Sequence, residues 1–108
     1  MERFEIRTDT ANAEDLVYVE AECFESNSSG GVSKAELRGD LYADRTLYIG
    51  YVETGELWRG GGVATRLLAH VIQVLGATRV TAQTVDERAD ALFAAVARSA
   101  PGVTFDID

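Results

Sequence analysis

Several residue types that often carry chemistry or crosslinks are nearly missing from this sequence. It contains one cysteine, one histidine, one proline and one lysine. A lone Cys23 excludes an internal disulfide and a multi-cysteine metal site. With His70 as the only histidine, a structural zinc site is not expected either, and we predict no metal site. No Ser-His-Asp or Cys-His arrangement has supporting spacing, so hydrolase chemistry is not indicated.

Positive charge is also scarce. Lys and Arg total 10 against 18 Asp and Glu, which gives a formal net charge of -8. Binding to nucleic-acid phosphates needs a basic patch, so we expect no nucleic-acid partner. Two interpretations of the acidity stay open. It is typical of proteins from salt-loving organisms, and it would also attract a cationic partner such as an amine or a basic peptide.

Long apolar runs are absent as well. The start of the chain, Met1 to Phe4, has no apolar signal segment, and no run is long enough to span a membrane. We therefore expect a cytoplasmic protein without a membrane partner. A length of 108 residues with 46% hydrophobic residues predicts one domain spanning 1–108, with a single modest core.

The strongest pattern present is a glycine-rich loop that leads into an amphipathic helix. Gly60 to Gly62 precede a run of apolar residues at a period of 3.6, and Gly76 follows the last of them, where a left-handed residue is expected to end the helix. The apolar positions are Ala64, Leu67, Leu68, Val71, Ile72 and Leu75. Both ends of this helix are thus predicted.

Such a loop suits a phosphate group. The first N–H groups of a helix have no partner within the helix, and the positive end of the helix dipole lies behind them. Glycines at 60–62 would let a pyrophosphate approach the backbone, and Arg59 could add a charged contact. The alternative, which stays open, is a plain connection that happens to be rich in glycine.

Two spaced stretches resemble the GNAT family of N-acetyltransferases. The stretch Arg59-Gly60-Gly61-Gly62-Val63-Ala64 is similar to the family signature Q/R-x-x-G-x-G/A, and residues 86–93 resemble a later family pattern, N-x-x-A-x-x-L-Y. The resemblance implies that the first stretch binds the pyrophosphate of acetyl-CoA. It places Asp86 where the family has an Asn that assists pantetheine binding, and Phe93 where it often has a proton-donating Tyr. The similarity covers about Leu47 to Phe93.

The resemblance also implies a reaction, acetyl transfer from acetyl-CoA to an amine of a small molecule or peptide. A backbone N–H near Tyr51 or Val52 would polarise the thioester carbonyl, and Glu53 is the first choice of general base. Tyr51 could supply the acid that Phe93 cannot, since phenylalanine has no proton to donate. Other candidates are Glu20 and Glu22 as base and Tyr48 as acid. The alternatives are that these glutamates are solvated carboxylates and that the tyrosines pack in the core.

Because Asp86 and Phe93 depart from the family pattern, two other classes remain. One is a degenerate, non-catalytic module that binds CoA or acts through a partner protein or as a homodimer. The other is a small α/β domain unrelated to acetyltransferases. CoA binding with turnover, binding without turnover, and no binding would distinguish the three classes.

The remaining chain completes the expected fold. We predict a strand around Phe4 to Ile6, a helix capped by Asn12 and running to about Phe24, a loop over 25–32, and a helix opened by a capping box at Ser33 to Glu36. Cys23 is expected to be a small core residue.

The second half is expected to begin with a central strand over 47–52. Gly50 in this strand marks a bulge or a close approach of another backbone, or else it is only a packing glycine. A strand over 79–85, a helix capped by Asp86 and an edge strand over 103–107 complete the chain. The resulting fold class is α/β, a GNAT-like mixed sheet in the order β-α-α-β-α-β-α-β with helices packed on it.

Overall fold

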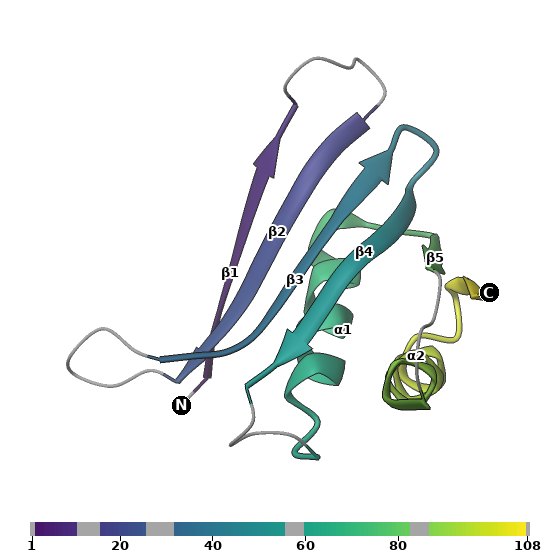
Figure 1. Ribbon diagram of the computed structural model, residues 1–108. Helices are drawn as coiled ribbons and strands as arrows, with labels where there is room; N and C mark the ends of the chain where they lie inside the picture. The colour runs from purple at the N-terminus through teal and green to yellow at the C-terminus, as the bar shows by residue number, and fades with distance from the viewer. Residues whose placement is uncertain (1, 11–15, 26–31, 56–59, 83–86, 108) are drawn as a thin grey trace.

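The computed structural model describes residues 2–10, 16–25, 32–55, 60–82 and 87–107. These residues form a six-stranded sheet and two helices (Figure 1). The elements are β1 (Glu2–Asp9), β2 (Leu16–Glu25), β3 (Val32–Tyr42), β4 (Thr46–Thr54), α1 (Val63–Leu75), β5 (Arg79–Ala82), α2 (Glu87–Ser99) and β6 (Thr104–Ile107).

The strands lie in the sheet in the same order as in the chain. β1 to β4 are antiparallel neighbours, whereas β4, β5 and β6 run parallel and are joined through α1 and α2. The sheet is therefore mixed, with a long antiparallel part and a short parallel part, as expected when helical crossovers separate the last strands.

One core holds these elements together. Helix α1 packs against the face of β1 to β4 that carries the buried side chains, and α2 packs against α1 and β6. Leu67, Leu68 and Val71 of α1 are fully buried, and Phe93 and Val96 come from α2. The other face of the four long strands carries most of their charged side chains and is open in Figure 1.

The two helices expected between residues 12 and 42 are wrong, because residues 16–25 and 32–42 are strands. In β2, burial alternates, with Val19, Ala21 and Cys23 inward and more exposed residues between them. The same residues also include the helical spacing of Leu16, Val19 and Cys23 that favoured a helix. A period of two prevails because each strand gains a full ladder of hydrogen bonds to its neighbours.

The capping box at Ser33 to Glu36 is likewise a false signal. In β3, Ala35, Leu37 and Leu41 point into the core, and Gly39 lies between them. Leu37 and Leu41 are four residues apart, which fits both a helix face and a strand face. The expected β-α-α-β beginning is thus overturned, and with it the GNAT-like α/β fold class. The described residues form one mixed sheet and two helices, and most of these residues lie in strands.

The elements around the glycine loop are confirmed. Helix α1 begins at Val63 and ends at Leu75, and Gly76 adopts the left-handed conformation, φ 67°, expected of its cap. The first strand, the central strand, the last helix and the edge strand also lie where the sequence predicts them. The strand expected over 79–85 is described only as far as Ala82. The proposed caps Asn12 and Asp86 lie outside the described residues, as does the centre of the 25–32 loop.

Gly50 forms a bulge, which is one of the alternatives that the sequence leaves open. Arg38 faces Tyr51 and Gly39 faces Ile49, so Gly50 is the extra residue of β4. The bulge changes the faces of the strand after it. Val52 packs against the core that contains Leu47 and Ile49, whereas Tyr51 is exposed. Without the bulge, the alternation of a strand would have placed Tyr51 on the same face as Leu47 and Ile49.

Candidate functional site

The start of α1 is the best-formed candidate for a binding site. Gly60 and Gly62 have positive φ angles, 84° and 75°, that glycine adopts without strain. Gly62 is the N-cap residue and provides no side-chain cap, and the first turn carries no acidic residue. The backbone N–H of Arg66 donates to the carbonyl of Gly62. The preceding N–H groups of Val63, Ala64 and Thr65 therefore lack partners within the helix, and an anion could accept from them.

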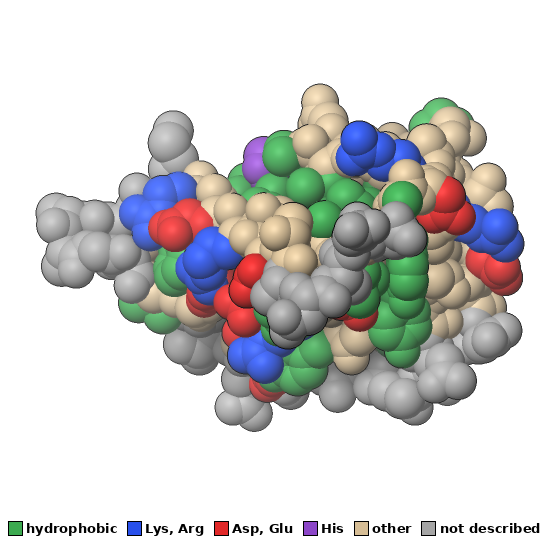
Figure 2. Space-filling view, turned by 90° about the horizontal axis from the view of Figure 1, so that it is seen from above, with side chains coloured by type: hydrophobic (Ala, Val, Ile, Leu, Met, Phe, Trp, Pro, Cys, Tyr) green, Lys and Arg blue, Asp and Glu red, His purple; other side chains and the backbone are tan. Residues whose placement is uncertain are grey.

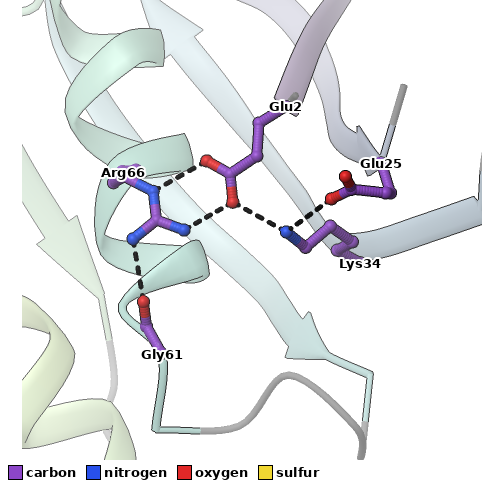
Figure 3. A network of polar contacts seen from close by, with 5 residues as sticks. All are labelled: Glu2, Glu25, Lys34, Gly61 and Arg66. Carbon is purple, nitrogen blue, oxygen red and sulfur yellow. Dashed lines mark hydrogen bonds and ion pairs between the residues drawn. The ribbon is translucent and has the colours of Figure 1, made fainter. Parts of the chain in front are cut away.

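A network of charged side chains lies beside this helix end (Figure 3). Arg66 donates from Nε and Nη2 to the two carboxylate oxygens of Glu2, at 2.8 and 2.5 Å, and from Nη1 to the carbonyl of Gly61, at 2.8 Å. Lys34 donates from Nζ to Glu2 at 2.9 Å and to Glu25 at 3.1 Å. The network thereby connects β1, β2, β3 and the first turn of α1.

A second bulge positions the lysine. In the pairing of β2 with β3, Cys23 faces Ala35 and Phe24 faces Ser33, so Lys34 is the extra residue of β3. Its side chain is buried rather than solvated. The hydrogen bonds that Lys34 donates to Glu2, and then to Glu25, raise the pKa of Lys34, so the ammonium stays charged. A buried ammonium needs such partners, since an unpaired buried charge is costly.

The network also lowers the pKa of Glu2. The hydrogen bonds from Arg66, and then from Lys34, lower the pKa of Glu2 from 4.5 to about 2. Among the described residues, two cations and two carboxylates meet here, so the charges of these four side chains balance. An anion at the start of α1 would thus depend on the backbone N–H groups and the helix dipole, with Arg66 as the nearest described cation.

The proposed catalytic pair is brought together on β4. The Tyr51 hydroxyl donates to the Glu53 carboxylate. This hydrogen bond, followed by burial, raises the pKa of Tyr51 to about 12, so the phenol keeps its proton at neutral pH. Arg38 lies over the Tyr51 ring, 5.2 Å from its centroid. The pair is on the open side of the sheet, while Val52 between them is half-buried on the core side.

Glu53 also ends a row of four glutamates that crosses the open side of the sheet. Glu5 faces Glu22, Glu22 faces Glu36, and Glu36 faces Glu53 on successive strands. Arginines compensate part of this charge: Arg3 pairs with Glu5 and Arg7 with Glu22. Acidic and basic side chains also lie next to one another at the surface seen in Figure 2. Carboxylates opposite one another on neighbouring strands repel.

We expect salt to relieve this repulsion. Raising KCl from about 0.01 M to about 1 M shortens the screening length from about 30 to about 3 Å and should raise the free energy of unfolding by about 1 kcal/mol. Glu36 lies between Glu22 and Glu53, so Glu36→Gln should stabilise the protein at low salt and reduce its salt dependence. Urea titrations at both salt concentrations measure this, with Asp90→Asn on an exposed part of α2 as the control. An equal salt dependence of wild type and Glu36→Gln would contradict the prediction.

Other candidate residues have structural partners. Glu20 and Glu22 lie on a strand instead of the expected helix, and both accept from Arg7, at 3.3 and 2.9 Å. Phe93 is a buried core residue. Cys23 is buried and free, as expected of a core residue, and burial raises the pKa of its thiol, which disfavours a nucleophile.

His70 of α1 is half-buried, and its ring stacks on Phe4 of β1 with centroids 4.7 Å apart. Arg59 and Asp86 lie outside the described residues.

Glu2, Lys34 and Arg66 were not singled out from the sequence as site residues. Glu2 is 32 residues from Lys34 and 64 residues from Arg66 in the chain. The one available signal was that Lys34 is the only lysine. Its burial depends on the β3 bulge, which no local pattern indicates.

Within the described ranges, no group of three or more His, Cys, Asp or Glu side chains is placed to hold a metal ion. None of the described helices is long and apolar enough to cross a membrane. A search against protein-family models finds no matching family, and a comparison with curated proteins finds no significant relative.

Proposed function

We propose that the start of α1 binds the pyrophosphate of acetyl-CoA and that the protein is an N-acetyltransferase acting on an amine of a small molecule or peptide. The observation that supports this most is the uncapped helix terminus behind Gly60 to Gly62, with N–H groups free of helical partners. The sequence resemblance points to the same residues. The proposal includes a cytoplasmic location, where acetyl-CoA is available.

Residues at the end of β4 would complete the reaction. In this proposal Glu53 accepts the ammonium proton of the amine, directly or through water, and a backbone N–H near Val52 polarises the thioester carbonyl. The amine nitrogen then attacks that carbonyl carbon, and the thiolate of CoA leaves and takes up a proton. Tyr51 is the nearest donor to Glu53, but a pKa of about 12 makes it a weak acid.

A non-catalytic CoA-binding module is the second candidate. It is favoured by Phe93, which is buried in the core and has no proton to donate. It is also favoured by the hydrogen bond that engages Glu53 with Tyr51. The same binding site serves both candidates, and only turnover separates them.

Calorimetry with acetyl-CoA tests the shared step. We expect binding in the micromolar range, and Gly62→Asp should weaken it at least tenfold, about 1.4 kcal/mol, because a carboxylate beside the N–H groups would repel phosphate. Aspartate is strained at the positive φ of Gly62, so thermal unfolding of each variant checks that lost binding does not reflect unfolding. The control is Gly76→Asp, which makes the same change at another positive-φ glycine at the opposite end of α1.

The outcomes are distinct. Binding that Gly62→Asp removes and Gly76→Asp keeps would support the site, and a screen of amines for CoA release would then separate enzyme from module. Absence of binding by folded wild-type protein, at both about 0.15 M and about 1 M salt, would reject both candidates. The glycines would then be a plain connection.

A further inference from the structure

The outer edge of β1 is the most informative surface that the proposed function does not use. β1 is the first strand of the sheet, and only β2 pairs with it among the described residues. An edge strand presents N–H and C=O groups that a further strand can bind. At eight residues, β1 is twice as long as β6 at the other edge, which has four.

The pattern of side chains on β1 is its own complement. When two copies of β1 pair antiparallel about a two-fold axis, residues that lie opposite each other are on the same face of the sheet. The axis must therefore lie at one residue, which then faces its own copy. With the axis at Ile6, each Glu5 lies opposite Arg7 of the second copy and each Ile6 lies opposite Ile6. Phe4 then lies opposite Thr8. The two charged pairs closest to the axis, each Glu5 with Arg7, thus bring opposite charges together.

Other registers are worse. With the axis at Glu5, Glu5 would face Glu5 and Arg3 would face Arg7, so all of these pairs would be of like charge. An axis at Arg7 would place two arginines opposite each other. An axis at Phe4 would pair Arg3 with Glu5, but it would use only residues 2–6 and would place Glu2, already bonded to Arg66 and Lys34, against Ile6.

The helix side of β1 also suits a second copy. Phe4 and Ile6 are only partly buried, although both pack against the core. An axis at Ile6 would bring these side chains of both copies together on the face that α1 covers, next to the stacked rings of Phe4 and His70. Apolar surface would be buried on this side, while ion pairs would form on the open side.

We propose that β1 pairs with β1 of a second copy, antiparallel about Ile6, to form a homodimer with one continuous sheet. The interface is a single strand pair, so the dimer is weak, with dissociation in the micromolar range. The net charge of -8 on each chain opposes association, and salt in the physiological range or above favours it.

Disulfide trapping tests the register. In a Cys23→Ala background, Ile6→Cys places two thiols directly opposite each other, with Cα atoms about 5 Å apart, and mild oxidation should yield a covalent dimer. Thr8→Cys on the same strand is the matched control. Its two thiols would be four residues apart along the strand, about 13 Å, which is too far for a disulfide.

Sedimentation equilibrium tests the charges. Arg7→Glu should weaken the dimer at least tenfold, and Glu5→Arg with Arg7→Glu should restore it, since opposite signs face each other again. Thermal unfolding of each variant checks the fold, because Arg7 also bonds Glu20 and Glu22. Folded wild-type protein that stays monomeric at about 1 mM would overturn the proposal. So would equal trapping of the Ile6→Cys and Thr8→Cys variants.

Discussion

Replacement of Gly39 by alanine should lower the free energy of unfolding by about 3 kcal/mol. A Cβ atom at Gly39 would lie 2.1 Å from the carbonyl oxygen of Tyr48 and 3.4 Å from Cα of Ile49. Both are backbone atoms of β4, so no side-chain rotation can relieve the contact. The strands would have to separate at the bulge where Gly39 faces Ile49, with loss of ladder hydrogen bonds. Urea unfolding followed by circular dichroism measures the change.

Gly102→Ala is the matched control. A Cβ there meets no atom within 4 Å, and its φ is not positive, so the same substitution should change stability by no more than about 0.5 kcal/mol. If both variants unfold at the wild-type urea concentration, the register of β3 and β4 would be incorrect. The close approach of the two strands would then need another explanation.

Glu2→Gln should cost about 2 kcal/mol at neutral pH. The lowering of the Glu2 pKa from 4.5 to about 2 corresponds to roughly 3 kcal/mol at most, and screening at a side chain that is 20% exposed reduces this. Lys34, whose side chain is only 9% exposed, would keep Glu25 but lose its contact with the Glu2 carboxylate. Arg66 would lose the bidentate pair that anchors the start of α1 to β1.

The effect should depend on pH with a definite sign. Because the folded-state pKa of Glu2 is below its unfolded value, its stabilisation is complete above pH 4.5 and is lost as the pH falls toward 2. The difference in unfolding free energy between wild type and Glu2→Gln should therefore shrink over this window.

Glu5→Gln on the same strand provides the comparison. Its pair with Arg3 is exposed, at 42% and 46% for the two side chains, so removal should have an effect below about 1 kcal/mol. Thermal melts at dilute protein and several pH values measure both variants. A wild-type minus Glu2→Gln difference that stays constant from pH 6 to 2 would contradict the assigned role of Glu2.

The candidate site was predictable in part. The glycines, the helix that follows them and Gly76 are close together in the chain, so a local pattern was sufficient to predict them. Tyr51 and Glu53 were proposed separately, as acid and base, and the structure places them two residues apart on one face of β4. The Glu2, Lys34 and Arg66 network joins residues up to 64 positions apart, and no local pattern predicts such a contact.

The error over residues 16–42 has a specific cause. Leu37 and Leu41 fit a helix and a strand equally well, and Ser33 with Glu36 satisfied a capping rule. Gly39 was the residue that argued against the helix, since glycine weakens a helix interior. In the sheet the same glycine makes room for the Tyr48 carbonyl, and this requirement is set by β4 rather than by the neighbours of Gly39.

By itself, the sequence determined the helices α1 and α2, the central and edge strands and the acidic charge, because these depend on neighbouring residues or on composition. Only the tertiary structure decided that residues 16–42 are strands, that Lys34 is buried, and that four glutamates form a row. Each of these depends on which strands become neighbours. Strand pairing brings together residues that are distant in the chain, and its hydrogen bonds and buried side chains outweigh weak local preferences.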